Sequence, residues 1–222
     1  MSRQSQDDYA VETVKRAINA QERGHFETEI VSVNSYQGKS AQQVQVDEGI
    51  RKANPEKIPQ LKPAFSADGT ITAASASFIS DGAAAVVMAK NSIAVKHGLV
   101  PIARIVAHHT HAQAPEWFTT APICAIKKVC EKARWSLNEV DLFEINEAFA
   151  VVTMAAIQDL QLPAEKVNVN GGACVLGHPI GASGTRIIVT LIHALQQRQL
   201  KKGVASLCIG GGEAIAIAIE LT

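Results

Sequence analysis

The sequence predicts an α/β layered fold over roughly residues 99–222, in which a mixed β-sheet carries helices on both faces. Short apolar runs typical of strands alternate there with amphipathic helical patterns. The last two runs are separated only by a glycine turn at 210–212, which implies an antiparallel pair inside that sheet. Charge is uneven, because residues 1–62 carry 18 of the 42 charged side chains. We therefore expect a solvated, partly irregular outer layer before the core.

The outer layer opens with a predicted helix that Ser2 caps and Gly24 ends. Its apolar positions follow helical spacing and are Ala10, Val11, Val14, Ala17 and Ile18. The polar stretch 34–62 follows, and its prolines prevent long regular structure. We expect this stretch to be an extended surface segment that needs another protein surface to pack against.

The middle of the chain predicts two strands and two helices. Residues 83–89 are a continuous apolar run between polar residues, which is typical of a strand covered on both faces. Residues 92–97 predict a short helix closed by Gly98, and residues 102–106 predict the next strand. A helix then begins at Pro122, a favoured residue in a first turn. Its apolar stripe comprises Ile123, Ile126, Val129, Cys130 and Ala133.

The remaining elements complete the predicted α/β domain. Residues 142–145 predict a short strand that runs straight into an alanine-rich helix from Asn146, and residues 167–169 predict another strand. A helix beginning near Ser183 is expected to bury Ile187, Ile188, Leu191, Ile192 and Leu195. Residues 204–209 and 214–221 are the two closing strands.

Composition excludes several classes of protein. Lys and Arg number 21 and Asp and Glu number 21, so a basic nucleic-acid-binding protein is excluded. Hydrophobic residues make up 47%, too many for a disordered chain. No apolar run approaches the ~20 residues that a membrane span needs, and the polar N-terminus shows no secretory signal. We expect a cytoplasmic globular protein with neither nucleic acid nor membrane as a partner.

Cysteine and histidine spacing does not indicate a metal centre. The cysteines form no C-x-x-C pair and are expected to be reduced thiols: Cys124, Cys130, Cys174 and Cys208. His108 and His109 would point to opposite faces of an extended segment, so at most His109 and His111 could share an ion. The alternative for these histidines is a polar loop or an interface lining, and we expect no metal.

Glycine placement points to the candidate active site. Nine of the 15 glycines lie in the last 52 residues, and eight of these nine gather in clusters at 171–184 and 208–212. Such density marks tight turns or close approach of main chain to a ligand. The first cluster contains His178, the second begins with Cys208, and Asn146 lies where a strand is predicted to meet a helix. Singly, each is more typical of a structural histidine, a core cysteine or a helix cap.

Together, three motifs resemble the thiolase family in order and spacing. They are Asn-Glu-Ala-Phe-Ala at 146–150, Asn-Val-Asn-Gly-Gly-Ala-Cys-Val-Leu-Gly-His-Pro-Ile-Gly-Ala-Ser-Gly at 168–184, and Cys-Ile-Gly-Gly-Gly at 208–212. The resemblance continues upstream through 61–65, 68–73 and 80–85 to the opening helix, so it covers essentially the whole chain. The sequence is similar to the biosynthetic thiolases, which are acetyl-CoA acetyltransferases.

The resemblance implies a thiolase-like layered fold and acyl transfer between CoA thioesters. Two acetyl-CoA molecules would condense to acetoacetyl-CoA and CoA, or the reverse thiolysis would occur, through an acyl-cysteine intermediate. CoA thioesters are then substrates, and no cofactor is implied.

The resemblance also implies catalytic roles for four residues. His178 takes the proton from the nucleophilic thiol and helps bind the thioester oxygen. Cys208 exchanges the α-proton of the second acetyl group, which needs a thiolate near a positive or polar group. Asn146 holds a water that completes one oxyanion hole with His178, and the N–H of Gly210 contributes to the second.

Two further positions are implied in substrate binding, and two depart from the family. Ser77 aligns with a contact to CoA pantetheine, and Phe149 with a residue that lines the acyl pocket. The family usually reads Thr-Ala-Gly-Asn-Ala-Ser-Gly where this chain has Ser75 in place of the asparagine and Phe78 in place of the last glycine. These departures bear on the pantetheine contacts.

A complete thiolase is longer, and its nucleophilic cysteine lies in an N-terminal half with a Cys-Gly-Ser-Gly-like setting that none of these four cysteines has. We therefore expect residues 1–75 to be the tail of a loop domain, 76–98 a closing strand and helix of the N-terminal domain, and 99–222 the C-terminal domain. Expected partners are acetyl-CoA or acetoacetyl-CoA, and either a second copy, in a dimer or tetramer, or a separate N-terminal half.

Three interpretations of function stay open at this point. The chain is an acyltransferase portion that works when the nucleophile-bearing half is present, or a catalytically inactive truncated paralogue that acts only as a folding or association module. A ketoacyl synthase is the third, although those enzymes use histidine or asparagine where this chain has Cys208.

Overall fold

The computed structural model describes residues 1–37 and 40–222 of the chain. Its core contains a four-stranded sheet with the order β3-β6-β5-β4, formed by β3 (Ala103–Ala112), β6 (Glu213–Leu221), β5 (Lys202–Cys208) and β4 (Leu142–Ile145). β4 runs parallel to β5, whereas β5 with β6 and β6 with β3 are antiparallel pairs. The predicted mixed sheet and its closing antiparallel pair are confirmed.

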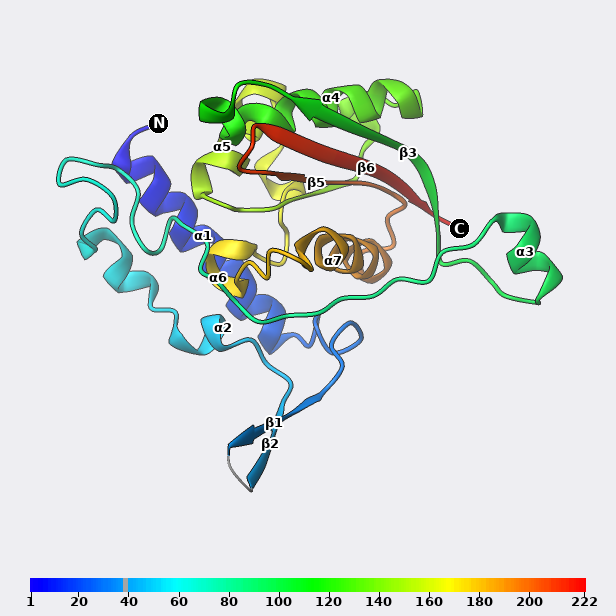
Figure 1. Cartoon of the computed structure of the whole chain (residues 1–222), viewed down its shortest axis with the longest axis horizontal. Coiled ribbons are helices and arrows are strands. Elements are labelled where there is room, and N and C mark those ends of the chain that lie inside the picture. Colours follow the sequence, from blue (N-terminus) through cyan, green and yellow to red (C-terminus); the bar gives the residue numbers. More distant parts are fainter. Residues whose placement is uncertain (38–39) are drawn as a thin grey trace.

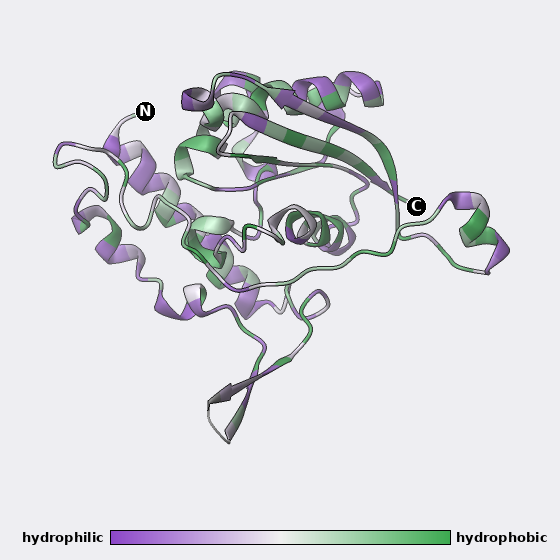
Figure 2. Ribbon diagram, in the orientation of Figure 1, coloured by the Kyte–Doolittle hydropathy of each residue, from purple (hydrophilic) through white to green (hydrophobic). Residues whose placement is uncertain are grey.

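Helices cover both faces of this sheet (Figure 1). α4 (Ala121–Ala133) and α5 (Ala150–Leu160) lie on one face, and α7 (Ser183–Gln197) lies on the other. The first face buries, among others, Ile126, Val129, Phe143, Val152 and Val204. The strand β6, which contacts α4 on one face of the sheet and α7 on the other, is largely hydrophobic along its length (Figure 2). This is the α/β layered class that the sequence predicts.

Helix α7 matches its prediction closely. It begins at Ser183, and Ile187, Leu191 and Leu195 are buried against the sheet at a helical spacing of four. Ile188 and Ile192, also predicted to be buried, are only partly so.

The N-terminal helix α1 (Arg3–Glu22) begins as predicted, because the Ser2 hydroxyl accepts a hydrogen bond of 3.1 Å from the Ser5 N–H. Its buried face packs on α6 (Ala173–Leu176) and α2 (Glu48–Lys52). The polar stretch that follows has only short elements. β1 (Val33–Gln37) and β2 (Ser40–Val44) form a projecting hairpin (Figure 1), and η1 (Pro55–Gln60) is a 3₁₀-helix.

Several short elements connect the larger ones. α3 (Asn91–Lys96) corresponds to the short helix predicted before Gly98. Three 3₁₀-helices lie in connections: η2 (Pro115–Thr120), η3 (Leu137–Glu139) and η4 (Ala164–Lys166). In the part of the chain that the structure describes, no helix is both long and apolar enough to cross a bilayer.

Residues 83–89 do not form the strand that the sequence predicts. They run unpaired past α7 towards α3 (Figure 1), and Val87 and Met88 are 99% and 71% exposed. A strand needs a neighbour to satisfy its backbone groups, and no strand among the described residues pairs with this one. The expectation that the run is covered on both faces is therefore wrong within this chain.

Residues 167–169 are also not a strand. Asn168 adopts a left-handed backbone conformation with φ 47°, so only Val167 forms an isolated bridge, to Phe143. The Asn168 side chain then replaces a strand partner at the end of β4. Its Oδ1 accepts the N–H of Ile145 and its Nδ2 donates to the Ile145 carbonyl, both at 2.8 Å.

The predicted helix from Asn146 begins later, because α5 starts at Ala150 with Phe149 as its N-cap residue. Asn146 therefore lies in a short connection at the end of β4 and does not sit at a helix N-terminus. The strand predicted at 102–106 is longer than expected, since β3 continues to Ala112.

Candidate active site

His178 lies in the loop between α6 and α7, where a second side chain orients it. Its Nδ1 is 2.6 Å from the Ser183 Oγ, and the Ser183 hydroxyl donates to the Pro179 carbonyl at 3.0 Å. Because the hydroxyl hydrogen is already used, Nδ1 must donate to Ser183, and the lone pair of the neutral ring lies on Nε2. Burial, together with the positive charge of Arg186, lowers the pKa of His178. Both effects favour a neutral ring, whose Nε2 lone pair can accept a proton.

Asn146 stands directly at that nitrogen. Its Nδ2 lies 3.5 Å from His178 Nε2, and its backbone N–H donates to the Ser206 carbonyl at 2.9 Å. The side chain is 1% exposed, and its Oδ1 is buried with no hydrogen-bond partner among the described residues. A buried amide oxygen without a partner requires an additional donor, such as a water or a ligand group.

Cys208 is the last residue of β5, at the same edge of the sheet as Asn146. The parallel register pairs Ile145 with Ser206, so Asn146 and Cys208 both follow paired positions at the carboxyl ends of β4 and β5. Cys208 belongs to the buried apolar cluster between the sheet and α4. In the described part of the chain, the hydrogen bonds of the His178 side chain go to Asn146 and Ser183, and none goes to Cys208.

Burial raises the pKa of the Cys208 thiol to about 11. The sequence-based expectation was a thiolate held near a positive or polar group. The apolar setting favours the neutral thiol, which has a proton to donate.

Gly210 lies in the exposed turn between β5 and β6. A methyl group added there would meet no atom within 4 Å. The packing of this chain therefore gives no reason for a glycine at this position.

Ser77 and Phe149 flank the same connection as Asn146. The N–H and the hydroxyl of Ser77 both donate to the Ala148 carbonyl, each at 3.0 Å, and Ala76 forms a bridge with Phe149. The Phe149 ring makes edge contacts with Phe65 and Phe118, whose ring centroids lie 6.0 and 6.3 Å away. Both residues are thus brought to the connection that carries Asn146.

The two departures from the family pattern have separate structural roles. The Ser75 hydroxyl accepts the Thr72 N–H at 2.9 Å and closes a turn. The Phe78 ring packs beside the His178 loop, where a methyl group at Gly177 would lie 3.2 Å from it. The Phe78 carbonyl accepts the N–H of His178 at 3.0 Å. Phe78 is thus attached to the loop that carries His178.

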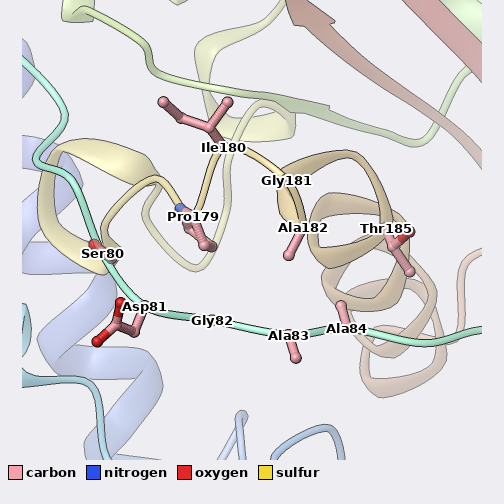
Figure 3. Close-up of a pocket in the computed structure, with 10 residues that line it drawn as sticks. All are labelled: Ser80, Asp81, Gly82, Ala83, Ala84, Pro179, Ile180, Gly181, Ala182 and Thr185. Carbon is pink, nitrogen blue, oxygen red and sulfur yellow. The ribbon is translucent and has the colours of Figure 1, made fainter.

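An open groove of about 610 Å³ borders this loop. Residues 80–84 form one wall, and Pro179 and Ala182 face them across the opening, whereas the Ile180 side chain points away (Figure 3). The groove continues from the His178 loop to Thr185 at the start of α7.

Sequence reasoning missed two residues of the site, Ser183 and Glu147. Glu147 is fully buried, and its carboxylate accepts hydrogen bonds from several segments. An acidic residue between the strand 142–145 and the apolar run 148–152 is a signal that could identify it, because buried carboxylates require specific partners.

The histidine cluster lies elsewhere. His108, His109 and His111 are on β3, the edge strand, and His111 Nε2 is 3.1 Å from the Gln113 Oε1. Burial, with Lys132 nearby, lowers the pKa of His109. Among residues 1–37 and 40–222, no three His, Cys, Asp or Glu side chains gather as a metal site would require.

Comparison with protein families identifies the class to which this site belongs. A model of the thiolase C-terminal domain matches residues 99–221, and a model of the thiolase N-terminal domain matches residues 1–92. The chain belongs to the thiolase family.

Among curated proteins, the chain is 48% identical over 221 residues to a probable acetyl-CoA acetyltransferase of Dictyostelium discoideum, covering 99% of this chain and 53% of that protein. It is also 48% identical to the cytosolic acetyl-CoA acetyltransferase of Mus musculus, covering 99% of this chain and 56% of that protein. The chain thus spans about half the length of the curated relatives it matches.

Solved structures give the same result. The Bacillus anthracis acetyl-CoA acetyltransferase superposes with a TM-score of 0.97 at 43% identity, covering 100% of this chain and 57% of that one. A thiolase from Ascaris suum in complex with coenzyme A superposes with a TM-score of 0.89 at 39% identity, covering 100% and 56%.

Proposed function

We propose that this chain carries the acid–base half of an acetyl-CoA acetyltransferase active site. The reaction is the condensation of two acetyl-CoA to acetoacetyl-CoA and CoA, or the reverse thiolysis. The observation that carries the proposal is the His178–Asn146 pair, in which Ser183 holds the imidazole in the tautomer that leaves Nε2 free. The acetyl-CoA acetyltransferases among its relatives support the choice of substrate.

In this proposal His178 is the general base. Nε2 takes the proton of a nucleophilic cysteine as its sulfur attacks the thioester carbon, and the CoA thiolate leaves. The resulting imidazolium N–H and a water held by Asn146 donate to the thioester oxygen, where negative charge develops. The unpartnered Asn146 Oδ1 supports this role, because it can accept a hydrogen bond from that water.

Cys208 supplies or removes the proton at the α-carbon. In thiolysis, the neutral thiol gives its proton to the carbanion released when the Cα–Cβ bond of acetoacetyl-CoA breaks. The raised pKa of Cys208 supports this direction, because the group is protonated before the step. The N–H of Gly210 would stabilise the enolate oxygen, and the place of Gly210 in the exposed turn directly after β5 and Cys208 supports this role. No cofactor is required.

We propose that the nucleophile is a cysteine outside this sequence. Cys130 and Cys174 are buried with raised pKa values, and Cys124 lies on α4 on the far side of the sheet from α7. Turnover then needs an N-terminal thiolase half, in the same polypeptide or as a separate chain. Association through the exposed residues 83–89 and a cytosolic location, as in the mouse relative, are parts of the same proposal.

Acyl transfer to that half tests the proposal. A separately expressed N-terminal half of a related thiolase is incubated with acetyl-CoA, with and without this chain, and its intact mass is measured. We expect its nucleophilic cysteine to gain one acetyl group only when this chain is present. An equal acetylation rate with His178→Ala would refute the role of His178.

A further inference from the structure

The buried carboxylate of Glu147 joins three segments of the chain beside the candidate active site. Its Oε1 accepts hydrogen bonds from the Tyr9 hydroxyl at 2.7 Å and from Asn168 Nδ2 at 3.0 Å. The Thr13 hydroxyl lies 3.0 and 3.2 Å from the two carboxylate oxygens, and Oε2 accepts the N–H of Cys174 at 3.1 Å. Glu147 is 0% exposed. In the described part of the chain no lysine or arginine forms an ion pair with it, so hydrogen bonds alone offset the buried charge.

These partners belong to the parts that carry the candidate catalytic residues. Glu147 follows Asn146 directly, whereas Cys174 lies in α6, four residues before His178. The Thr13 hydroxyl also accepts the N–H of Gly172 at 2.9 Å, so the start of that loop is fixed as well. A methyl group at Gly172 would lie 2.4 Å from the Glu147 carboxyl carbon, so the absence of a side chain at Gly172 is what lets this loop approach the carboxylate so closely. We propose that Glu147 is a positioning residue that sets the distance between Asn146 and His178.

This inference rests on the proposed function for its catalytic meaning. The chemistry of the partners explains why a carboxylate is needed. Asn168 cannot reverse its amide, because its Oδ1 already accepts the N–H of Ile145. The partner at Cys174 is a backbone N–H, which can only donate. An uncharged amide at position 147 would therefore place its NH₂ group against Asn168 or Cys174, in either orientation. Two donors facing each other in a buried site cost free energy, and the connection or the loop must move apart.

The test uses Glu147→Gln, which keeps the size of the side chain and replaces one of its two acceptor oxygens by an NH₂ donor. In the isolated chain, the Asn146 side-chain amide is followed by NMR while His178 is titrated. In the unaltered chain we expect its resonances to shift as the ring gains a proton at 3.5 Å. In Glu147→Gln we expect that response to be lost while far-UV circular dichroism is retained. An undiminished response in a folded Glu147→Gln chain would overturn the proposal.

If the Glu147→Gln chain does not fold, the NMR response of the Tyr9→Phe chain tests the proposal instead. This substitution removes one donor and leaves the carboxylate and its other bonds in place, so a weakened response supports the proposal and an unchanged one overturns it. Glu131→Gln, on the exposed face of α4, is the matched control and should respond as the unaltered chain does.

With an N-terminal half added, Glu147→Gln should lower kcat on the order of 100-fold, the effect of a displacement of about 1 Å, with KM unchanged. A KM effect alone would contradict positioning. If even the unaltered chain gives no turnover in that mixture, the proposed function fails, and the NMR response still decides whether Glu147 holds the pair together.

Discussion

Ser183 Oγ lies 2.6 Å from His178 Nδ1, and this contact fixes which nitrogen of the imidazole can act as a base. Ser183 is fully buried at the first residue of α7, so the orienting group belongs to a rigid element. The Pro179 carbonyl takes the serine hydrogen and removes the alternative in which Nδ1 is the acceptor. We therefore expect proton transfer at His178 to occur through Nε2.

Ser183→Ala should remove the preference of His178 for the Nδ1–H tautomer. The ring would lose its Nδ1 partner, and ¹⁵N chemical shifts should change from a single Nδ1–H form to a mixture of both neutral forms. In the complemented enzyme kcat should fall about tenfold or more, since such a hydrogen bond contributes about 1–3 kcal/mol. Ser206→Ala is the control, because that buried serine bonds to the Ile215 carbonyl. An unchanged ring spectrum in Ser183→Ala would contradict the orienting role.

Cys208 should react slowly with iodoacetamide at neutral pH. Burial raises its pKa to about 11, so only a small thiolate fraction exists at pH 7.5, and the rate should rise roughly tenfold per pH unit up to about pH 10. Cys124 is the only one of the four thiols that is not buried, and it should be labelled first. Peptide mass mapping, with Cys208→Ala to assign the site, gives the rates. Fast labelling of Cys208 at pH 7 would mean that it is a thiolate.

Stability should fall as pH rises from about 5 to 8. Burial raises the pKa of Glu29 to about 7 and that of Glu144 to about 8, the latter in spite of Arg186 at 3.3 Å. The folded chain therefore keeps protons that the unfolded chain releases near pH 4.5, and the free energy of unfolding decreases through this window and levels above it. Urea midpoints at several pH values measure the slope, and Glu144→Gln should flatten it. A slope that Glu144→Gln leaves unchanged would contradict the shift at Glu144, whereas the lowered pKa values of His178 and His109 add a slope of opposite sign in both proteins.

The unpaired run 83–89 should make the isolated chain self-associate. Val87 and Met88 are almost entirely exposed, and the backbone around them pairs with no strand among the described residues. Val87→Lys combined with Met88→Lys should reduce the apparent mass in light scattering, whereas Lys90→Ala should not. A monomer over a wide concentration range for the unaltered chain would show that the exposed run does not drive association.

Local patterns predicted the core elements well and the connections poorly. The strand 142–145 is found at those residues, where Leu142, Phe143 and Ile145 are apolar and polar residues flank the segment. The run 83–89 is apolar throughout and yet forms no strand, because no strand among the described residues pairs with it. The strand predicted at 167–169 does not form, because Asn168 adopts a left-handed backbone conformation and its side chain hydrogen-bonds to Ile145. Such a long-range hydrogen bond leaves no periodic signal in the sequence.

The sequence motifs indicate which residues belong to the candidate site better than they indicate how those residues are arranged. Asn146 and His178 were named from motifs, and the structure brings them within 3.5 Å. The motif does not reveal how far burial raises the pKa of Cys208, because that burial depends on residues of β4, β6 and α4 that lie outside the motif. Glu147 and Ser183 act through hydrogen bonds across loops, which spacing along the chain does not reveal.

Turnover of acetoacetyl-CoA tests the central claim most directly. The chain is assayed for thiolysis with CoA alone, then with a separately expressed N-terminal thiolase half, and then with that half and Cys208→Ala or His178→Ala. We predict no turnover by the chain alone, turnover in the mixture, and loss of that turnover in either variant. Steady turnover by the 222-residue chain alone, lost in Cys208→Ala, would show that Cys208 is itself the nucleophile and would contradict the account.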